Sequence, residues 1–290
     1  MKNIKMAKLF FLLPAVFLMF STFAFAQNAQ ETEPLPQSRP NDTFYERTSF
    51  EKRAPLKLPH VREADILWSK RIWQNIDLNL LPNQPLYYPV EPTGNFSSLM
   101  TVLSDALLAG EIRAYDRDDE NFRGDPIDPE ELFESLGRTE TFTDEDGQVI
   151  SVDIAFNPAE VMRFRIMEEW FIDTRRSTLD VRIIGLSPAR EAIDFETGEF
   201  LGWESLFWIP FSEIRELLAS NPVYNRQNSV QRISFDDYFL RRLFDATIYR
   251  EERPDNLVIS EYIEDPNEQL LEAQRIKERI RNMELDLWHY

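Results

Sequence analysis

The stretch NPAEVMRFRIMEEWFIDTRRSTLDVRIIGLSP, residues 157–188, carries the strongest fold-forming pattern in this chain. Asn157 suits a helix N-cap, Pro158 suits the first helical position, and Glu160 suits the acidic position of a capping box. Large apolar side chains follow at helical spacing and would form one wide face: Met162, Phe164, Ile166, Met167, Trp170 and Phe171. The first half of the stretch therefore predicts a helix.

The second half of the stretch predicts a strand. Residues 179–185 (LDVRIIG) alternate between apolar and polar side chains at first and then become fully apolar. That pattern, rich in β-branched residues, is typical of a strand in the middle of a sheet. We expect the helix and the strand to pack against each other and to anchor the main core.

Other segments predict helices and hairpins around this core. Apolar residues recur every four positions in residues 62–78 and predict a helix there: Ala64, Trp68, Ile72 and Ile76. Further helices are predicted at residues 96–109 and 265–288, and from the capping positions Ser212 and Ser234. Turn residues predict hairpins over residues 139–156 and 192–211. This is an α+β fold.

The predicted domain organisation has four parts. These are a signal peptide (residues 1–26), an extended proline-rich arm (27–60), a main α+β domain (61–252) and a C-terminal helix (265–288). The helices and antiparallel hairpins of the third part surround one main core. Roughly 260 residues remain after the signal, which suffices for one large domain.

Several of these fold-forming segments resemble one family of proteins. They are EEWFIDTRRSTLDVRIIGLSPAR (168–190), FWIPFSEIRELL (207–218), WSKRIWQNIDL (68–78) and LLAGEIRAYD (107–116). They resemble the GldN/PorN family, periplasmic proteins of the gliding-motility and type IX secretion machinery of Bacteroidota. The resemblance spans residues 60–249 and lies in fold-forming positions, so it implies a role and not a reaction.

The resemblance implies a structural subunit that self-associates in a ring beneath the outer membrane. The implied partners are a GldK/PorK-like outer-membrane lipoprotein and the periplasmic part of a GldM/PorM-like motor subunit. Association with the outer membrane would then be peripheral and would depend on the lipoprotein. The family implies no enzymatic activity and no cofactor.

The N-terminus predicts export. Lys2, Lys5 and Lys8 form a basic segment, an apolar run follows over residues 9–25, and the Ala-Phe-Ala motif at residues 24–26 is a cleavage signal. We expect the mature chain to begin at Gln27 and not to insert into the membrane after cleavage. The alternative is an uncleaved membrane anchor, for which the apolar run is short.

Net charge and cysteine content limit the kinds of partner and of anchoring that we expect. The formal charge is −19, and because the predicted signal holds three lysines and no acid, the mature chain has a charge of −22. So acidic a chain argues against nucleic acid or anionic lipid as a partner. The chain has no cysteine, which excludes a lipid-modified N-terminus and any disulfide bond, so its stability depends on the core.

Two terminal segments hold candidate partner contacts. In the arm, Phe44, Tyr45 and Phe50 fit neither a helical nor an alternating pattern. The arm is therefore either a flexible linker or a segment that docks on a neighbouring subunit, with these aromatic side chains as anchors. In the C-terminal helix a narrow apolar seam includes Ile276, Ile280, Met283 and Leu287. The seam suits a coiled coil, a partner's groove or packing on its own domain.

One tandem pair of basic residues is a third candidate. Arg175 and Arg176 lie between the predicted helix and strand, where they could bind a carboxylate on a partner. The alternative is that they balance the nearby acids Glu168, Glu169 and Asp173.

Residues for familiar chemistry are scarce, so we expect no catalytic, cofactor or metal site. The chain has two histidines, His60 and His289, and lacks the glycine patterns of phosphate-binding loops. The acidic loop 116–126 fails the EF-hand frame, because Asn121 replaces the turn glycine and Ile127 the final glutamate. Two competing classes stay open: a periplasmic carboxylate-based hydrolase, and a soluble ligand-binding protein using the aromatic strand 200–211.

Overall fold

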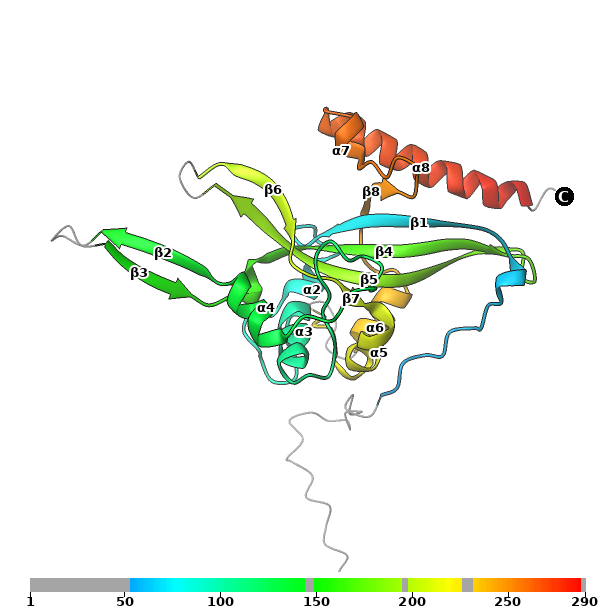
Figure 1. Ribbon diagram of the computed structural model, residues 1–290. Helices are drawn as coiled ribbons and strands as arrows, with labels where there is room; N and C mark the ends of the chain where they lie inside the picture. The colour runs from blue at the N-terminus through cyan, green and yellow to red at the C-terminus, as the bar shows by residue number, and fades with distance from the viewer. Residues whose placement is uncertain (1–52, 144–148, 195–197, 226–231, 288–290) are drawn as a thin grey trace, which may run out of the picture. The chain divides into compact units, whose positions relative to one another are not determined.

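An antiparallel sheet of six strands forms the centre of the structure (Figure 1), a computed structural model that describes residues 53–143, 149–194, 198–225 and 232–287. The strand order is β6-β5-β4-β1-β8, and β7 also pairs with β5. The strands are β1 (Ile66–Asp77), β4 (Val161–Asp173), β5 (Thr178–Ile193), β6 (Phe200–Ser205), β7 (Ile209–Pro210) and β8 (Thr247–Glu251). A separate two-stranded sheet consists of β2 (Arg138–Thr143) and β3 (Val149–Ile154).

The central strand β4 occupies the segment for which the sequence predicted a helix, and that prediction was wrong. The N-cap is real, since Asn157 Oδ1 accepts a hydrogen bond from the Ala159 amide, but it starts only the 3-10 turn η2 (Pro158–Glu160). The misleading signal is the spacing of four residues, which equals two full pleats of a strand as well as about one helical turn. β4 is buried along nearly its whole length, so its apolar residues do not alternate with polar ones.

The helix predicted over residues 62–78 was wrong for the same reason. After the 3-10 turn η1 (Glu63–Asp65) this segment forms β1, which pairs antiparallel with β4 over its whole length. Trp68, Ile72 and Ile76 lie four residues apart and therefore share one face of a strand just as they would share one face of a helix.

The remaining predicted helices and hairpins are present, but the prediction that Ser212 caps its helix was wrong: Ser212 is the second residue of that helix, whose N-cap is Pro210. α3 (Leu99–Leu108) is followed by Gly110 with a φ of 71°, the left-handed geometry typical of a helix C-terminus. Ser234 caps the next predicted helix, because its Oγ accepts from the Asp237 amide. The helices are α2 (Gln84–Tyr87), α3, α4 (Pro129–Leu136), α5 (Phe211–Ser220), α6 (Phe235–Leu240), α7 (Ile259–Tyr262) and α8 (Pro266–Leu287). The β2–β3 and β5–β6 hairpins also agree with the sequence, and the α+β class is confirmed.

The main hydrophobic cluster joins helices α3, α5 and α6 to the sheet. From β4 it receives Phe164 and Ile166, both fully buried. The helices contribute large side chains, among them Leu99, Leu103, Leu107, Ile214, Leu218, Phe235 and Phe239. Burying such side chains stabilises the fold by about 1.5–3 kcal/mol each before the entropy cost.

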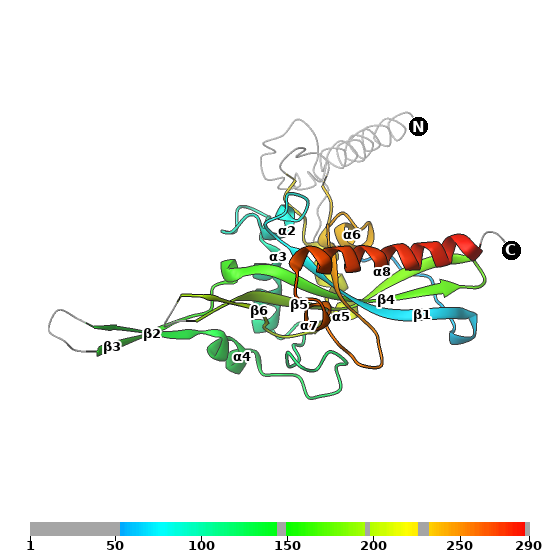
Figure 2. The same ribbon diagram turned by 90° about the horizontal axis from the view of Figure 1, so that it is seen from above.

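A second cluster attaches the C-terminal helix to the same sheet. Figure 2 shows α8 lying over the strands. Ile276 and Ile280 of α8 pack with Ile72 of β1, Trp170 of β4 and Ile248 of β8. The apolar seam of α8 is therefore covered by its own domain, which is one of the alternatives that the sequence left open. Among the residues described, no helix is both long and apolar enough to cross a bilayer.

The packing of α8 gives a first prediction. Ile276→Ala should lower the free energy of unfolding of the isolated chain by about 2–5 kcal/mol, because it empties a fully buried site. Urea unfolding followed by tryptophan fluorescence measures this. Leu270→Ala is the matched control on the same helix; its side chain is 57% exposed, so the change should stay within about 0.5 kcal/mol. Equal effects of the two substitutions would show that α8 does not pack on its own sheet.

Candidate functional site

A buried carboxylate marks the junction of the two clusters. Along β4, Ile166 belongs to the main cluster and Trp170 to the cluster under α8. Glu168 lies between them on the same face, since side chains two apart in a strand point the same way. Its side chain is fully buried, so the charge depends entirely on hydrogen-bonding partners from this chain.

Three side chains donate hydrogen bonds to Glu168. Arg242 is bidentate, with Nη1 2.6 Å from Oε1 and Nη2 3.3 Å from Oε2. Gln74 Nε2 lies 2.5 Å and Trp170 Nε1 2.8 Å from Oε2. The donors come from β1, from β4 and from the segment that follows α6, so this one carboxylate ties three parts of the chain together.

The backbone of Arg242 is shaped for this contact. Its φ is 51°, in the left-handed region that non-glycine residues rarely adopt. Its guanidinium also lies over the Phe244 ring, 5.2 Å from the centroid, and 5.7 Å from that of Trp170. Strained backbone of this kind persists where surrounding contacts over-determine it. The cluster is thus a structural connection, and both carboxylate oxygens are already engaged.

A second ion cluster attaches α8 to the sheet. Glu251 of β8 is buried and accepts from Lys70 of β1 at 2.8 Å. Arg279 of α8 donates to both of its oxygens at 2.9 and 2.8 Å. Across the described ranges, no three histidine, aspartate or glutamate side chains are grouped so that they could share a metal ion.

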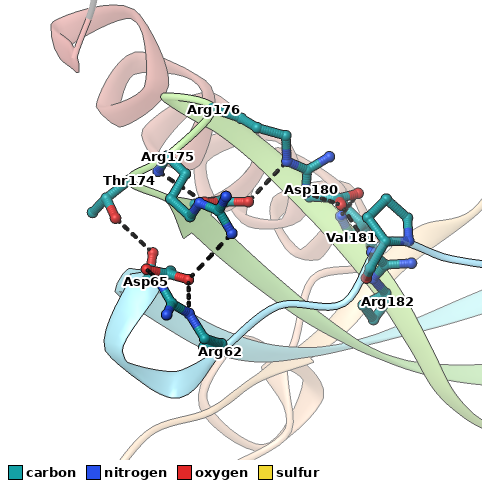
Figure 3. Close-up of polar contacts among 10 residues, drawn as sticks. Arg62, Asp65, Thr174, Arg175, Arg176, Asp180, Val181 and Arg182 are labelled. Carbon is teal, nitrogen blue, oxygen red and sulfur yellow. Dashed lines mark hydrogen bonds and ion pairs between the residues drawn. The ribbon is translucent and has the colours of Figure 1, made fainter.

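The tandem arginines lie in the β4–β5 turn and contact acids of their own chain (Figure 3). Arg176 Nε is 2.8 Å from Asp173 Oδ2, and its Nη2 is 3.0 Å from Asp180 Oδ2. Arg175 lies 3.9 Å from Asp65 and is largely exposed. Of the acids expected to balance the pair, Asp173 does so, whereas Glu168 and Glu169 pair with Arg242 and Arg71. A partner contact at these arginines stays a prediction.

These ion pairs also set the charge state of the turn. The hydrogen bond from Arg176 lowers the pKa of Asp173, and the hydrogen bond from Arg62 lowers the pKa of Asp65. A lowered carboxyl pKa stabilises the folded state above the pKa of the unfolded chain. This stabilisation is lost as the pH falls through the lowered pKa values of Asp173 and Asp65, so these ion pairs stabilise the turn most near neutral pH.

The candidate partner contacts of the N-terminal arm and of α8 differ in where the structure places them. Phe44, Tyr45 and Phe50 lie outside the described residues. Ile276 and Ile280 are buried against their own sheet and, in this structure, are not accessible to a partner. Met283 is half-buried further along α8. Leu287 is the last residue of α8, and its side chain lies outside the described part.

The segment 200–211, expected as one aromatic strand, forms β6, β7 and the first residue of α5. Phe207, Trp208 and Phe211 are buried in the core. Phe200 and Leu201 are exposed at the start of β6. The segment therefore forms no continuous aromatic surface of the kind that a ligand-binding strand would need.

Sequence reasoning missed the Glu168 cluster, although a signal was present. Glu168 stands inside the run Ile166-Met167-Glu168-Glu169-Trp170-Phe171, where apolar residues flank two acids. Once such a segment is assigned to a buried strand, an acid that points inward requires a cationic partner. The partner itself, Arg242, is 74 residues away and depends on the tertiary fold.

Comparison with known proteins identifies one family. A family model described as gliding motility associated protein GldN matches residues 61–289. A search of curated proteins found no match.

The Glu168 cluster gives a second prediction. Arg242→Met should destabilise the isolated chain by about 3 kcal/mol, the low end for breaking a buried pair, because the Arg242 side chain is 37% exposed. The double variant Glu168→Leu/Arg242→Met should lose less than the sum of the losses of Glu168→Leu and Arg242→Met, since no buried charge remains unpaired. It should stay less stable than the unmodified chain, because Gln74 and Trp170 lose their acceptor. Urea unfolding measures all of these variants.

The exposed pair Arg275–Glu272 supplies the control for this test. Arg275→Met should change the free energy of unfolding by less than about 1 kcal/mol. A double variant whose loss equals the sum of the two single losses would contradict a coupled buried pair.

Proposed function

We propose, from the premise that this chain belongs to the GldN family of gliding-motility proteins, that it is a structural subunit of the type IX secretion and gliding machinery. The family match over residues 61–289 is the observation that carries the proposal. The match includes every strand of the six-stranded sheet and all of α8, so it concerns the complete folded unit and not a short motif.

In this proposal the chain acts by binding other proteins and not by catalysis. The polar clusters support a mechanical role, because the buried acids Glu168, Glu251 and Asp236 are each engaged by arginines of the same chain. A general acid or base needs free access to a substrate proton. No specific feature of the described residues favours the hydrolase or the ligand-binding alternative.

The proposed site of action is the periplasm. The lysines and apolar run of residues 1–26 support export, and the mature chain begins at Gln27. Lacking cysteine, the chain has no lipid anchor of its own and associates with the outer membrane through a GldK/PorK-like lipoprotein. It self-associates in a ring and contacts a GldM/PorM-like motor subunit from the inner membrane.

The N-terminal arm is the proposed connection to neighbouring subunits. Residues 53–61 follow an extended path without helix or strand and remain largely exposed on the domain. The aromatic residues Phe44, Tyr45 and Phe50 lie just upstream and supply apolar anchors of the type that dominate protein interfaces. A segment of this kind adds binding area without changing the folded core.

This proposal gives a third prediction. The native protein, isolated gently from cells with a C-terminal tag, should be recovered in a very large complex that contains a lipoprotein. The triple variant Phe44→Ala/Tyr45→Ala/Phe50→Ala should lose the complex, because it removes the proposed anchors while keeping the length of the arm. Native mass analysis measures both.

The matched control changes a charged residue that already has a partner within the chain. Arg275→Ala, which removes the partner of Glu272 on α8, should leave the complex intact. Arg175→Ala/Arg176→Ala is a separate test: an intact complex means that these arginines only balance Asp173, Asp180 and Asp65, and a weakened complex means that they contact a partner. Circular dichroism and the unfolding temperature of each variant verify that the domain is folded. A clean monomer of the unmodified protein under the same conditions would contradict the structural role.

A further inference from the structure

One edge of β5 is left open beside a groove. β4 pairs with one edge of β5 along almost its full length. On the other edge, β7 pairs at residues 185–186 and β6 at residues 189–193. Among the described strands, none pairs with the outer edge of residues 178–184. Unpaired edges of this kind accept extended segments.

Acidic side chains cover the open amides of this edge. The Val181 amide donates to its neighbour Asp180 Oδ1 at 2.9 Å, and the Leu179 amide donates to Glu284 of α8 at 3.4 Å. The edge lines a groove of about 470 Å³ whose other wall consists of α5 and α6. Phe211, Phe239 and Ile183 supply its apolar surface.

An extended segment of the same chain, residues 53–61, already lies against this groove. Arg215 Nη2 donates to the Leu56 carbonyl at 2.6 Å, and Arg182 Nη2 donates to the Pro59 carbonyl at 3.2 Å. Arg53 pairs with Asp237 of α6 at 2.5 Å. Pro55 and Leu58 line the cavity. The groove thus recognises main-chain carbonyls, a proline and a basic side chain.

The segment is held loosely where it lies. In the described part of the chain, residues 54–61 donate no hydrogen bond to another backbone group. Leu56 is 63% exposed and Leu58 is 40% exposed, so two apolar side chains remain only partly covered. A segment held by a few side-chain contacts exchanges readily with an identical segment from another copy.

Charge is compatible with a second copy as the source of the occupant. Residues 52–62 contain Lys52, Arg53, Lys57 and Arg62 and no acid, in a chain whose formal charge is −19. The groove lining carries two acids, and each of its three arginines pairs with an acid of the same chain: Asp180, Glu216, Arg182, Arg215 and Arg242. Asp237, beside the groove, already pairs with Arg53. A second copy carries the same acids and the same basic segment, so the pairing seen within one copy can also form between two.

We propose that residues 53–61 of one copy occupy the β5–α5–α6 groove of the next copy in the assembly. The inference rests on the self-association in the proposed function and identifies the surfaces that it uses. The contact is head-to-tail: each copy gives a segment and receives another. Such heterologous contacts close into a ring when the rotation between neighbours permits it.

The absence of native cysteine allows a direct test. One tagged copy carries Leu58→Cys in the segment, and a differently tagged copy carries Ser212→Cys in the groove wall; both positions line the cavity. The two are co-expressed, the assembly is isolated intact, and a short bismaleimide is added. We expect a covalent product that contains both tags. Arg53→Glu/Lys57→Glu in the first copy should abolish it by reversing the charge of the segment.

Two controls make the result decisive. Leu271→Cys, exposed near the start of α8 and absent from the groove lining, replaces Ser212→Cys and should give no product with both tags. A single copy carrying Leu58→Cys/Ser212→Cys reports whether the segment lies in its own groove. An intact assembly in which cross-links form only within one copy would overturn this inference and leave the structural role standing. A protein that stays monomeric would overturn both.

Discussion

The structure depends on the burial of β4 between two neighbouring strands and beneath three groups of packed side chains. Phe164 and Ile166 are buried against α3, α5 and α6, and Trp170 is buried against α8. On the other face Met167 packs with Trp73 and Trp208. A charge on such a strand is costly unless it is paired, so Glu168 and its donors hold β1, β4 and the segment after α6 in one arrangement.

Whether the sequence predicted an element correctly depended on the kind of signal that it carried. Signals with a local mechanism predicted two elements correctly: the helix capped by Ser234 and the hairpin of β2 and β3. A spacing of four residues misled, because it satisfies both the helical and the strand period. β1 and β4 are strands and not helices because they pair with each other. They lie about ninety residues apart in the chain, so a local sequence pattern carries no information about this pairing.

For the candidate partner contacts too, the sequence showed the local pattern but not the residues that the fold brings to it. The arginines of the β4–β5 turn could be matched with a nearby acid, Asp173, from the sequence alone, but Asp65 enters only through the fold. The seam of α8 was visible as a pattern, whereas its cover, Ile72 and Ile248, comes from strands far away in the chain. The groove beside β5 was not predictable, because it arises where β6 and β7 leave one edge of β5 unpaired.

The core of the protein is therefore complete in one chain, and the proposed contacts with other copies are added at its edges. Hydrogen exchange of the isolated protein and of the intact assembly tests this most directly. The account predicts equal protection of β4 and α8 in both, with added protection in residues 53–61 and along the open edge of β5. If β4 or α8 gained protection only on assembly, the core would not be complete in a single chain, and the account would be wrong.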